Sequence, residues 1–138
     1  HPSGNLGAQL RTVEELMIIG NKIPFVNETL NMKKALQIIS SKKLGTLIVQ
    51  NNKKNTTGII TDGQIRRFNS MSNNLRDLSV KKVMTKNPIS INQDTLAEKA
   101  LSIMNSKKIT SLCVHKDKNI KKTVGILHIH NILNSNIL

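Results

Sequence analysis

The chain is poor in aromatic residues. Its 138 residues include two phenylalanines and neither tryptophan nor tyrosine. Proteins that bind single-stranded nucleic acids stack the bases on aromatic side chains, so this composition argues against such a role. The chain also lacks any apolar run near the roughly 20 residues that span a bilayer, and no stretch typical of a signal peptide stands at its N-terminus. We therefore expect a cytoplasmic protein without a membrane partner.

Cysteine and acidic residues are scarce as well. A single cysteine excludes a disulfide within the chain, and Cys113 stands in an apolar run, which predicts a small buried thiol. The chain has eight Asp and Glu and 21 Lys and Arg, which gives a formal net charge of +13. Such a charge attracts anions. The lysines are spread along the chain as pairs, from Lys33-Lys34 to Lys121-Lys122, which is typical of solvated surfaces. We expect attraction of small anions, with nucleic-acid binding as the weakest alternative.

What the chain does contain is a repeat. Thr29–Leu36, a Ser-Lys-Lys turn and Gly58–Ile60 return as Thr95–Leu101, a second Ser-Lys-Lys and Gly125–Leu127, at an offset of 65 to 67 residues. Each copy is too small to bury a good core alone. We therefore predict two copies that pack on each other with pseudo-twofold symmetry and a cleft between them.

Hydrophobic periodicity assigns the same order of elements to each copy. A short amphipathic turn precedes each one, at Val13–Met17 and Val80–Met84. A strand, a helix, two strands and a second helix follow, with the helices on one face of a small sheet. They are expected at residues 23–26, 29–43, 46–50, 58–61 and from 62, and again at 88–91, 95–108, 110–115, 124–128 and from 129. The predicted fold class is α/β (α+β), with Thr29 and either Asp94 or Thr95 as helix N-caps.

Gly-Ile-Ile-Thr at 58–61 and Gly-Ile-Leu-His at 125–128 close the second hairpin strand of each copy. Together with the Val-x-x-Leu-Met and Val-x-x-Val-Met segments, this co-linear pattern resembles a tandem pair of cystathionine-β-synthase-type (CBS) domains. The resemblance implies two β-α-β-β-α repeats, at residues 13–79 and 80–138, after a linker at 1–12. A paired module of this kind is expected to sense a ligand.

A narrower resemblance concerns the start of the chain. His1-Pro2-Ser3-Gly4-Asn5-Leu6-Gly7, followed by the paired repeats and the run from Thr61 to Arg67, is similar to the C-terminal half of D-arabinose 5-phosphate isomerases. In that family a sugar isomerase (SIS) domain of the same chain ends in a His-Pro-Gly-Gly type motif, where Ser3 here replaces the usual glycine.

This second resemblance implies a parent enzyme that interconverts ribulose 5-phosphate and arabinose 5-phosphate, at the entry to Kdo synthesis for lipopolysaccharide. His1 would match a histidine of the isomerase site. A terminal histidine without a base and a phosphate cradle does not perform aldose–ketose proton transfer. We therefore expect no isomerase activity and no cofactor in this fragment.

In nucleotide-binding CBS repeats, the threonine at the strand end lies near phosphate, and an aspartate three residues later holds the ribose hydroxyls. The matching residues are Thr61 and Gln64 in the first repeat and His128 and Asn131 in the second. The resemblance implies that these four residues bind the ligand. The carboxylate that accepts from a ribose diol is absent from both positions, which argues against adenosine. A simple helix-cap role for Thr61 is the alternative.

The densest group of charged candidates is Asp62, Arg66 and Arg67. Arg66 follows Asp62 by four residues on the expected helix, so a local ion pair between them is one interpretation. Gly63 stands four residues before Arg67, which leaves that guanidinium without such a partner. Because a free guanidinium binds phosphate or carboxylate through paired hydrogen bonds, we predict that this group holds the anionic part of a ligand.

Histidines are the remaining candidates for chemistry. His128 and His130 are expected on one strand face, an arrangement found in metal sites. No cysteine or nearby acid supplies a third ligand, so we predict that no metal binds. His115, next to Lys116 and Asp117, is expected in a solvated turn.

Two interpretations of the whole chain remain. The first is a regulatory, noncatalytic module of a sugar-phosphate isomerase that binds an anionic nucleotide or nucleotide sugar in the cleft between the repeats. We expect a cytidylyl-activated sugar acid from the end of the pathway rather than AMP or ATP, because the ribose-holding aspartate is absent. The phosphate and carboxylate of such a ligand would suit the arginines better than a neutral sugar would. The alternative is a structural oligomerisation module whose ligand site has decayed. We expect a homodimer. The candidate contact residues are isoleucines that do not belong to the helix faces assigned to the core: Ile18, Ile19, Ile38 and Ile103.

Overall fold

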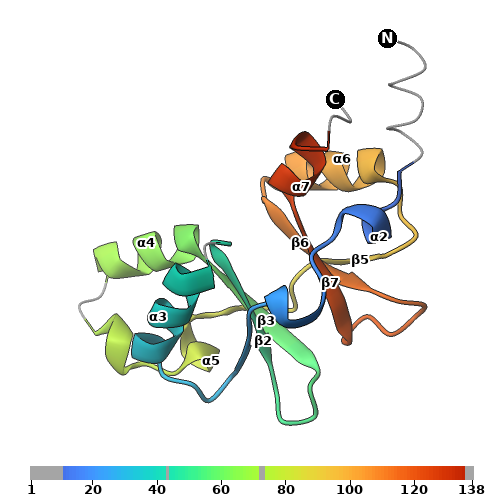
Figure 1. The fold of residues 1–138 in the computed structure, drawn as a ribbon. Helices are drawn as coiled ribbons and strands as arrows, with labels where there is room; N and C mark the ends of the chain where they lie inside the picture. The colour runs from blue at the N-terminus through green and yellow to red at the C-terminus, as the bar shows by residue number, and fades with distance from the viewer. Residues whose placement is uncertain (1–10, 43, 72–73, 136–138) are drawn as a thin grey trace. The chain divides into compact units, whose positions relative to one another are not determined.

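A computed structural model of the protein describes residues 11–42, 44–71 and 74–135. The chain forms two compact units (Figure 1). The first unit consists of residues 21–88, and the second unit combines the described residues up to Gly20 with those from Ile89 onward. No helix among the described residues is long and apolar enough to cross a membrane.

The first unit is built on a four-stranded sheet of order β1-β2-β3-β4, in which β1 and β2 are parallel and the other pairs antiparallel. A short 3-10 turn, η1 (Gly20–Lys22), leads into the unit. Its elements are β1 (Phe25–Asn27), α3 (Met32–Lys42), β2 (Thr46–Gln50), β3 (Thr56–Thr61), α4 (Asp62–Met71), η2 (Leu75–Asp77), α5 (Val80–Val83) and β4 (Thr85–Lys86).

The second unit repeats this plan on a three-stranded sheet of order β5-β6-β7, again with a parallel first pair and an antiparallel second pair. Its elements are α2 (Val13–Leu16), β5 (Ser90–Asn92), α6 (Ala97–Lys107), β6 (Ser111–His115), β7 (Thr123–His128) and α7 (Ile129–Leu133). The predicted β-α-β-β-α order is confirmed in both units, and so is the α/β fold class.

The helices α3 and α6 begin later than predicted. The Asn31 Oδ1 accepts a hydrogen bond from Lys34 N (2.9 Å) on the first turn of α3, whereas Thr29 donates to the side chain of Asn27. Leu96, which has no polar side chain, precedes α6. The N-cap predictions were therefore wrong, because an Asx turn occupies the residues where the sequence placed the caps.

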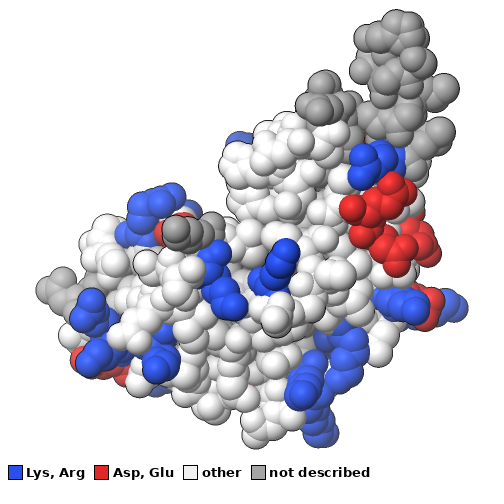
Figure 2. All heavy atoms as spheres, viewed as in Figure 1, with Lys and Arg blue, Asp and Glu red and all other residues white. Residues whose placement is uncertain are grey.

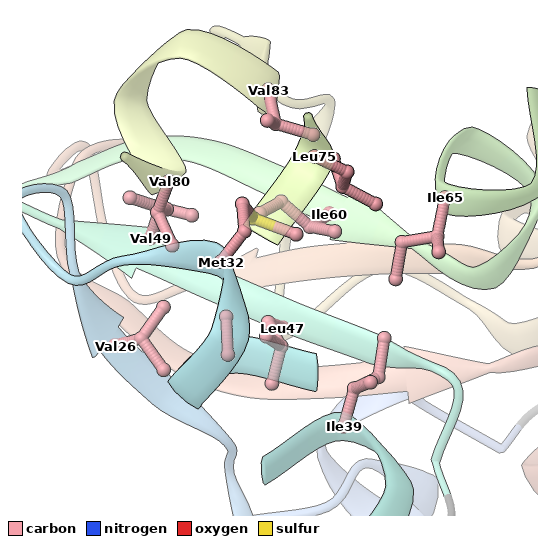
Figure 3. Packing of buried hydrophobic residues seen from close by; sticks show 11 residues of the cluster. Val26, Met32, Ile39, Leu47, Val49, Ile60, Ile65, Leu75, Val80 and Val83 are labelled. Carbon is pink, nitrogen blue, oxygen red and sulfur yellow. The ribbon is translucent and has the colours of Figure 1, made fainter. Parts of the chain in front are cut away.

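An apolar core lies between the sheet and the helices of each unit. In the first unit, side chains from α3 and α5 face those of the central strands (Figure 3). The buried cluster of the first unit is Val26, Met32, Ala35, Ile39, Leu47, Val49, Ile60, Ile65, Leu75, Val80 and Val83. That of the second unit is Val13, Ile91, Ala97, Ala100, Met104, Leu112, Val114, Leu127 and Ile132.

The short helices α2 and α5 exchange between the repeats. α2 precedes the first repeat in the sequence, yet it packs in the second unit, where Val13 N donates to Thr95 O (2.8 Å). α5 precedes the second repeat, yet it lies in the first unit, where Val80 N donates to Leu30 O (2.7 Å). The compact units therefore differ from the sequence repeats in these two segments.

Two glycines make room for the exchanged segments. A β-carbon on Gly125 would collide with the side chain of Met17, the residue that follows α2. A β-carbon on Gly58 would collide in the same way with Met84, which follows α5. Close packing against methionine, and not a turn, therefore accounts for glycine at the start of both Gly-Ile motifs.

Candidate functional site

Thr61 ends β3 and stands directly before α4. Gln64 Oε1 accepts a hydrogen bond from Thr61 N (3.0 Å), and Thr61 Oγ1 accepts one from Gln64 N (3.4 Å). This reciprocal arrangement is a capping box, which satisfies backbone N–H groups that the first turn of a helix otherwise leaves unpaired. The helix-cap interpretation of Thr61 is thereby confirmed.

The side-chain nitrogen of Gln64 also donates hydrogen bonds within the first unit. Gln64 Nε2 donates to Thr85 Oγ1 (2.5 Å) and to Val83 O (3.5 Å). The side chain thus ties α4 to the chain that follows α5. Sequence reasoning missed Thr85, and its position directly after the Val-x-x-Val-Met segment was the available signal.

Replacing Gln64 with alanine should lower the free energy of unfolding by about 1 kcal/mol, because both the cap and the bond to Thr85 are lost. Urea denaturation measures this change. Gln37→Ala is the matched control, since Gln37 is exposed on α3 and its replacement should leave stability nearly unchanged. Equal stability of the two variants would mean that Gln64 has no structural role.

The second unit has the same arrangement at the start of α7. His128 N donates to Asn131 Oδ1 (2.8 Å), and His128 Nδ1 accepts from His130 N (3.1 Å). Asn131 therefore takes the place that Gln64 has in the first unit. In both units the amide that stands where nucleotide-binding repeats have aspartate is bonded to the backbone at the start of its own helix.

The rings of His128 and His130 stack with their centroids 4.9 Å apart. Burial, and secondarily the charge of His130, lowers the pKa of His128 below its ordinary value. The expectation that both imidazoles share a strand face was wrong, because the chain turns into α7 after His128. Within the described residues no group of three His, Cys, Asp or Glu side chains is placed to hold a metal.

Asp62, Arg66 and Arg67 are all exposed on α4. Asp62 and Arg66 form no ion pair, and the one ion pair within the described residues joins Arg11 to Glu15. The ion pair between Asp62 and Arg66 that the sequence allowed is therefore absent. Among the described residues, neither Arg66 nor Arg67 has a carboxylate partner.

The guanidinium groups of these arginines turn toward the start of α4. A β-carbon placed on Gly63 would lie 3.3 Å from Arg67 Nη1, 3.9 Å from Arg66 Nη2 and 3.9 Å from Thr61 Oγ1. The carboxylate of Asp62 lies instead against Gly45, the residue directly before β2. Two guanidinium groups and a hydroxyl thus gather at the positive end of a helix, an arrangement suited to phosphate or carboxylate.

His115 is not in a solvated turn, as the sequence suggested. It lies in β6, is 8% exposed, and its Nδ1 is 2.7 Å from Ser90 Oγ on the neighbouring strand. The hydroxyl partner allows the imidazole to be buried, a pairing between β5 and β6 that the sequence does not reveal. The prediction of a buried thiol at Cys113 is confirmed, since that residue is 1% exposed.

The remaining predicted residues have mixed positions. Ile19 is 58% exposed, whereas Ile38 and Ile103 are half-buried and pack against the cores. Ile18 is half-buried and pairs with Ile126 of β7. His1 lies outside the described residues.

The family model for the CBS domain matches the chain twice, over residues 13–70 and 80–136. Each match contains one full strand–helix–strand–strand–helix set and begins with the short helix that precedes it in the sequence. The start of α4 and the start of α7 therefore occupy equivalent places in two copies of this domain.

Two curated relatives carry the same name. The arabinose 5-phosphate isomerase KdsD of Escherichia coli (strain K12) is 34% identical over 139 residues, which are 100% of this chain and 42% of the relative. The protein of that name from Francisella tularensis subsp. tularensis is 40% identical over 135 residues, covering 96% of this chain and 40% of the relative. The chain thus spans about two fifths of the length of these relatives.

The fold also matches solved structures. The crystal structure of CBSX2 in complex with AMP superposes with a TM-score of 0.76 at 22% sequence identity, covering 90% of this chain and 94% of that chain. At this level of identity the similarity establishes the shared fold.

Proposed function

Because the chain belongs to the CBS domain family, whose pairs are regulatory rather than catalytic, we propose that it senses an anionic nucleotide or nucleotide sugar. The anionic group of the ligand binds at the start of α4, between the guanidinium groups of Arg66 and Arg67 and beside the Thr61 hydroxyl. The observation that carries this proposal is the convergence of two unpaired guanidinium groups over Gly63.

The regulated activity is that of a sugar-phosphate isomerase. Support comes from the 34–40% identity to arabinose 5-phosphate isomerases over nearly the whole chain. In this proposal a SIS domain of the same protein carries the catalytic site, and the paired repeats report the level of a pathway product to it. A cytidylyl-activated sugar acid, with its phosphate and carboxylate, supplies two anionic groups for two arginines.

Replacing Arg67 with alanine should weaken binding of the cytidylyl-activated sugar acid roughly tenfold, because one charge-assisted hydrogen bond is lost. Isothermal titration calorimetry on the 138-residue chain measures the affinity, with AMP titrated in parallel. The matched control is Arg76→Ala, since Arg76 is exposed on η2 of the same unit. Tight AMP binding without a response to the sugar acid would refute the ligand class, and equal losses in both variants would refute the site.

A second function is favoured by the hydrogen bonds of Gln64 and Asn131. Both amides are bonded to the backbone at the start of their own helices, so neither is free to replace the aspartate that holds a ribose. In that case the pair is an oligomerisation module without a ligand, associating as a homodimer. No heat with any nucleotide, together with self-association in sedimentation velocity, would favour this function over the first.

A further inference from the structure

The two units carry equivalent surfaces where a short helix meets the first turn of a long one. In the second unit, Glu14 N donates to Gln93 O (2.9 Å), which holds α2 beside the start of α6. In the first unit, Lys81 N donates to Glu28 O (3.0 Å), which holds α5 beside the start of α3 in the same way. Isolated bridges at matching positions, Thr12 with Leu96 and Asn31 with Ser79, confirm the correspondence.

These equivalent surfaces have opposite charge. The exchanged helices read Val-Glu-Glu-Leu in the second unit and Val-Lys-Lys-Val in the first. On the long helices, Glu98 stands where Lys33 stands, whereas Lys99 matches Lys34 and Lys107 matches Lys42. We call Lys33, Lys34, Lys81 and Lys82 the basic face, and Glu14, Glu15, Asp94 and Glu98 the acidic face. All eight side chains are exposed, and of the four carboxylates Glu15 is paired with Arg11.

The space-filling view shows where the charged side chains of the two faces gather (Figure 2). Acidic side chains gather over α2 and the start of α6, and Lys and Arg side chains gather around α5 and η2. The whole sequence between residues 21 and 88 has thirteen Lys and Arg against three Asp and Glu. The rest of the sequence has eight Lys and Arg against five Asp and Glu, so both parts are net positive, and the opposite charge is confined to the two faces.

Two lysines of the basic face, Lys33 and Lys34, stand where they cost stability. The first turn of a helix carries partial positive charge, so carboxylates there are stabilising and cations destabilising. Glu98 follows this rule on the first turn of α6, and Lys33 and Lys34 oppose it on the first turn of α3. α2 and α5 are single turns of four residues, to which the rule does not apply. Within the described residues none of the four lysines forms an ion pair, and the nearby carboxylate of Glu28 accepts from Thr57 Oγ1 (3.2 Å).

We propose that the basic face of one copy binds the acidic face of a second copy of this chain. A carboxylate-rich partner offsets the unfavourable charge at the start of α3 and pairs with the lysines of α5, and the acidic face is a surface of that kind in the equivalent position. The contact joins different surfaces of the two copies: formed once it is heterologous, and formed twice about a two-fold axis it is isologous. This inference goes beyond the proposed ligand site, because none of its residues takes part.

Charge reversal tests the pairing. Lys81→Glu/Lys82→Glu cancels the charge of the basic face, where Lys33 and Lys34 remain, and Glu14→Lys/Glu98→Lys cancels that of the acidic face, where Glu15 and Asp94 remain. Each variant alone should associate at least tenfold more weakly than the wild type in sedimentation velocity, because the attraction between a basic and an acidic face is then lost. An equimolar mixture of the two variants should associate again, since acidic faces of one variant meet basic faces of the other. Circular dichroism checks that both variants are folded.

Ionic strength and a control variant complete the test. At about 0.15 M salt the Debye length of ~8 Å screens the repulsion between copies of net charge +13, while close pairs still interact. At about 1 M salt the wild type should dissociate. Lys116→Glu/Lys118→Glu changes the net charge as much as Lys81→Glu/Lys82→Glu does, but on the β6–β7 turn, and should associate like the wild type.

Three results would overturn the proposal. The first is a wild type that stays monomeric at about 0.15 M salt, and the second is a mixture of the two variants that fails to associate. The third is a loss of DNA-oligonucleotide binding in Lys81→Glu/Lys82→Glu with unchanged self-association. That result would assign the basic face to nucleic acid.

Discussion

Replacing Leu112 with alanine should lower the free energy of unfolding of the second unit by about 3 kcal/mol. Leu112 is completely buried on β6, within the cluster that joins the sheet to α2, α6 and α7. Loss of a fully buried leucine side chain removes its transfer free energy from water and leaves a cavity, which together cost about 2–5 kcal/mol. Urea denaturation followed by circular dichroism measures the change.

Leu133→Ala provides the comparison within the same unit. Leu133 ends α7 and is 44% exposed, so its truncation should change stability by about 0.5 kcal/mol or less. Val13→Ala should lower the same transition as Leu112→Ala, because Val13 of α2 is completely buried in the same cluster. A Val13 variant that leaves the second unit unchanged would contradict the exchange of α2.

Alkaline pH should destabilise the protein through Cys113. Burial raises the pKa of this thiol from 9.0 to about 11, although a hydrogen bond from Thr123 acts in the opposite direction. Below pH 9 the thiol is neutral in both states. Between pH 9 and 11 the unfolded chain loses the proton that the folded chain retains, so rising pH favours unfolding. The loss should reach about 2 kcal/mol near pH 11.

The pH effect is isolated by comparing the wild type with Cys113→Ala. Lysines and the other groups titrate alike in both proteins, so their difference in the free energy of unfolding reports the thiol alone. This difference should be constant between pH 7 and 8 and should shift against the wild type above pH 9, in urea denaturation under reducing conditions. Parallel pH profiles for the two proteins would show that the thiol is not held in an apolar environment.

The order of the elements could be predicted because apolar periodicity depends on local geometry. β2 lies where the sequence placed it, and α3 and α6 differ from the prediction mainly at their first residues. Those first residues were misassigned because Asn27 and Asn92 accept hydrogen bonds from the backbone two residues later, forming turns that compete with a helix cap.

The features that the sequence did not reveal depend on contacts between residues that lie far apart along the chain. The Val-x-x-Leu-Met pattern predicts a short amphipathic helix but contains no information on which repeat it packs against. The burial of His115 depends on Ser90 of another strand, and the role of Gln64 depends on Thr85. The structure places the side chains of Thr61, Arg66 and Arg67 near one another at the start of α4, but which of their atoms remain free became clear only from the hydrogen bonds.

Because α2 and α5 are exchanged between the repeats, the two units can complete their folding only in a fixed order during synthesis on the ribosome. The first unit is continuous in sequence, so all of its elements are available once residue 88 has emerged. α2 emerges earlier than any of them, yet its partners on β7 and α6 are synthesised last. Val13 and Met17 therefore remain without their packing partners until β7 has been synthesised. The second unit then forms from segments at the two ends of the described chain, which closes a long loop.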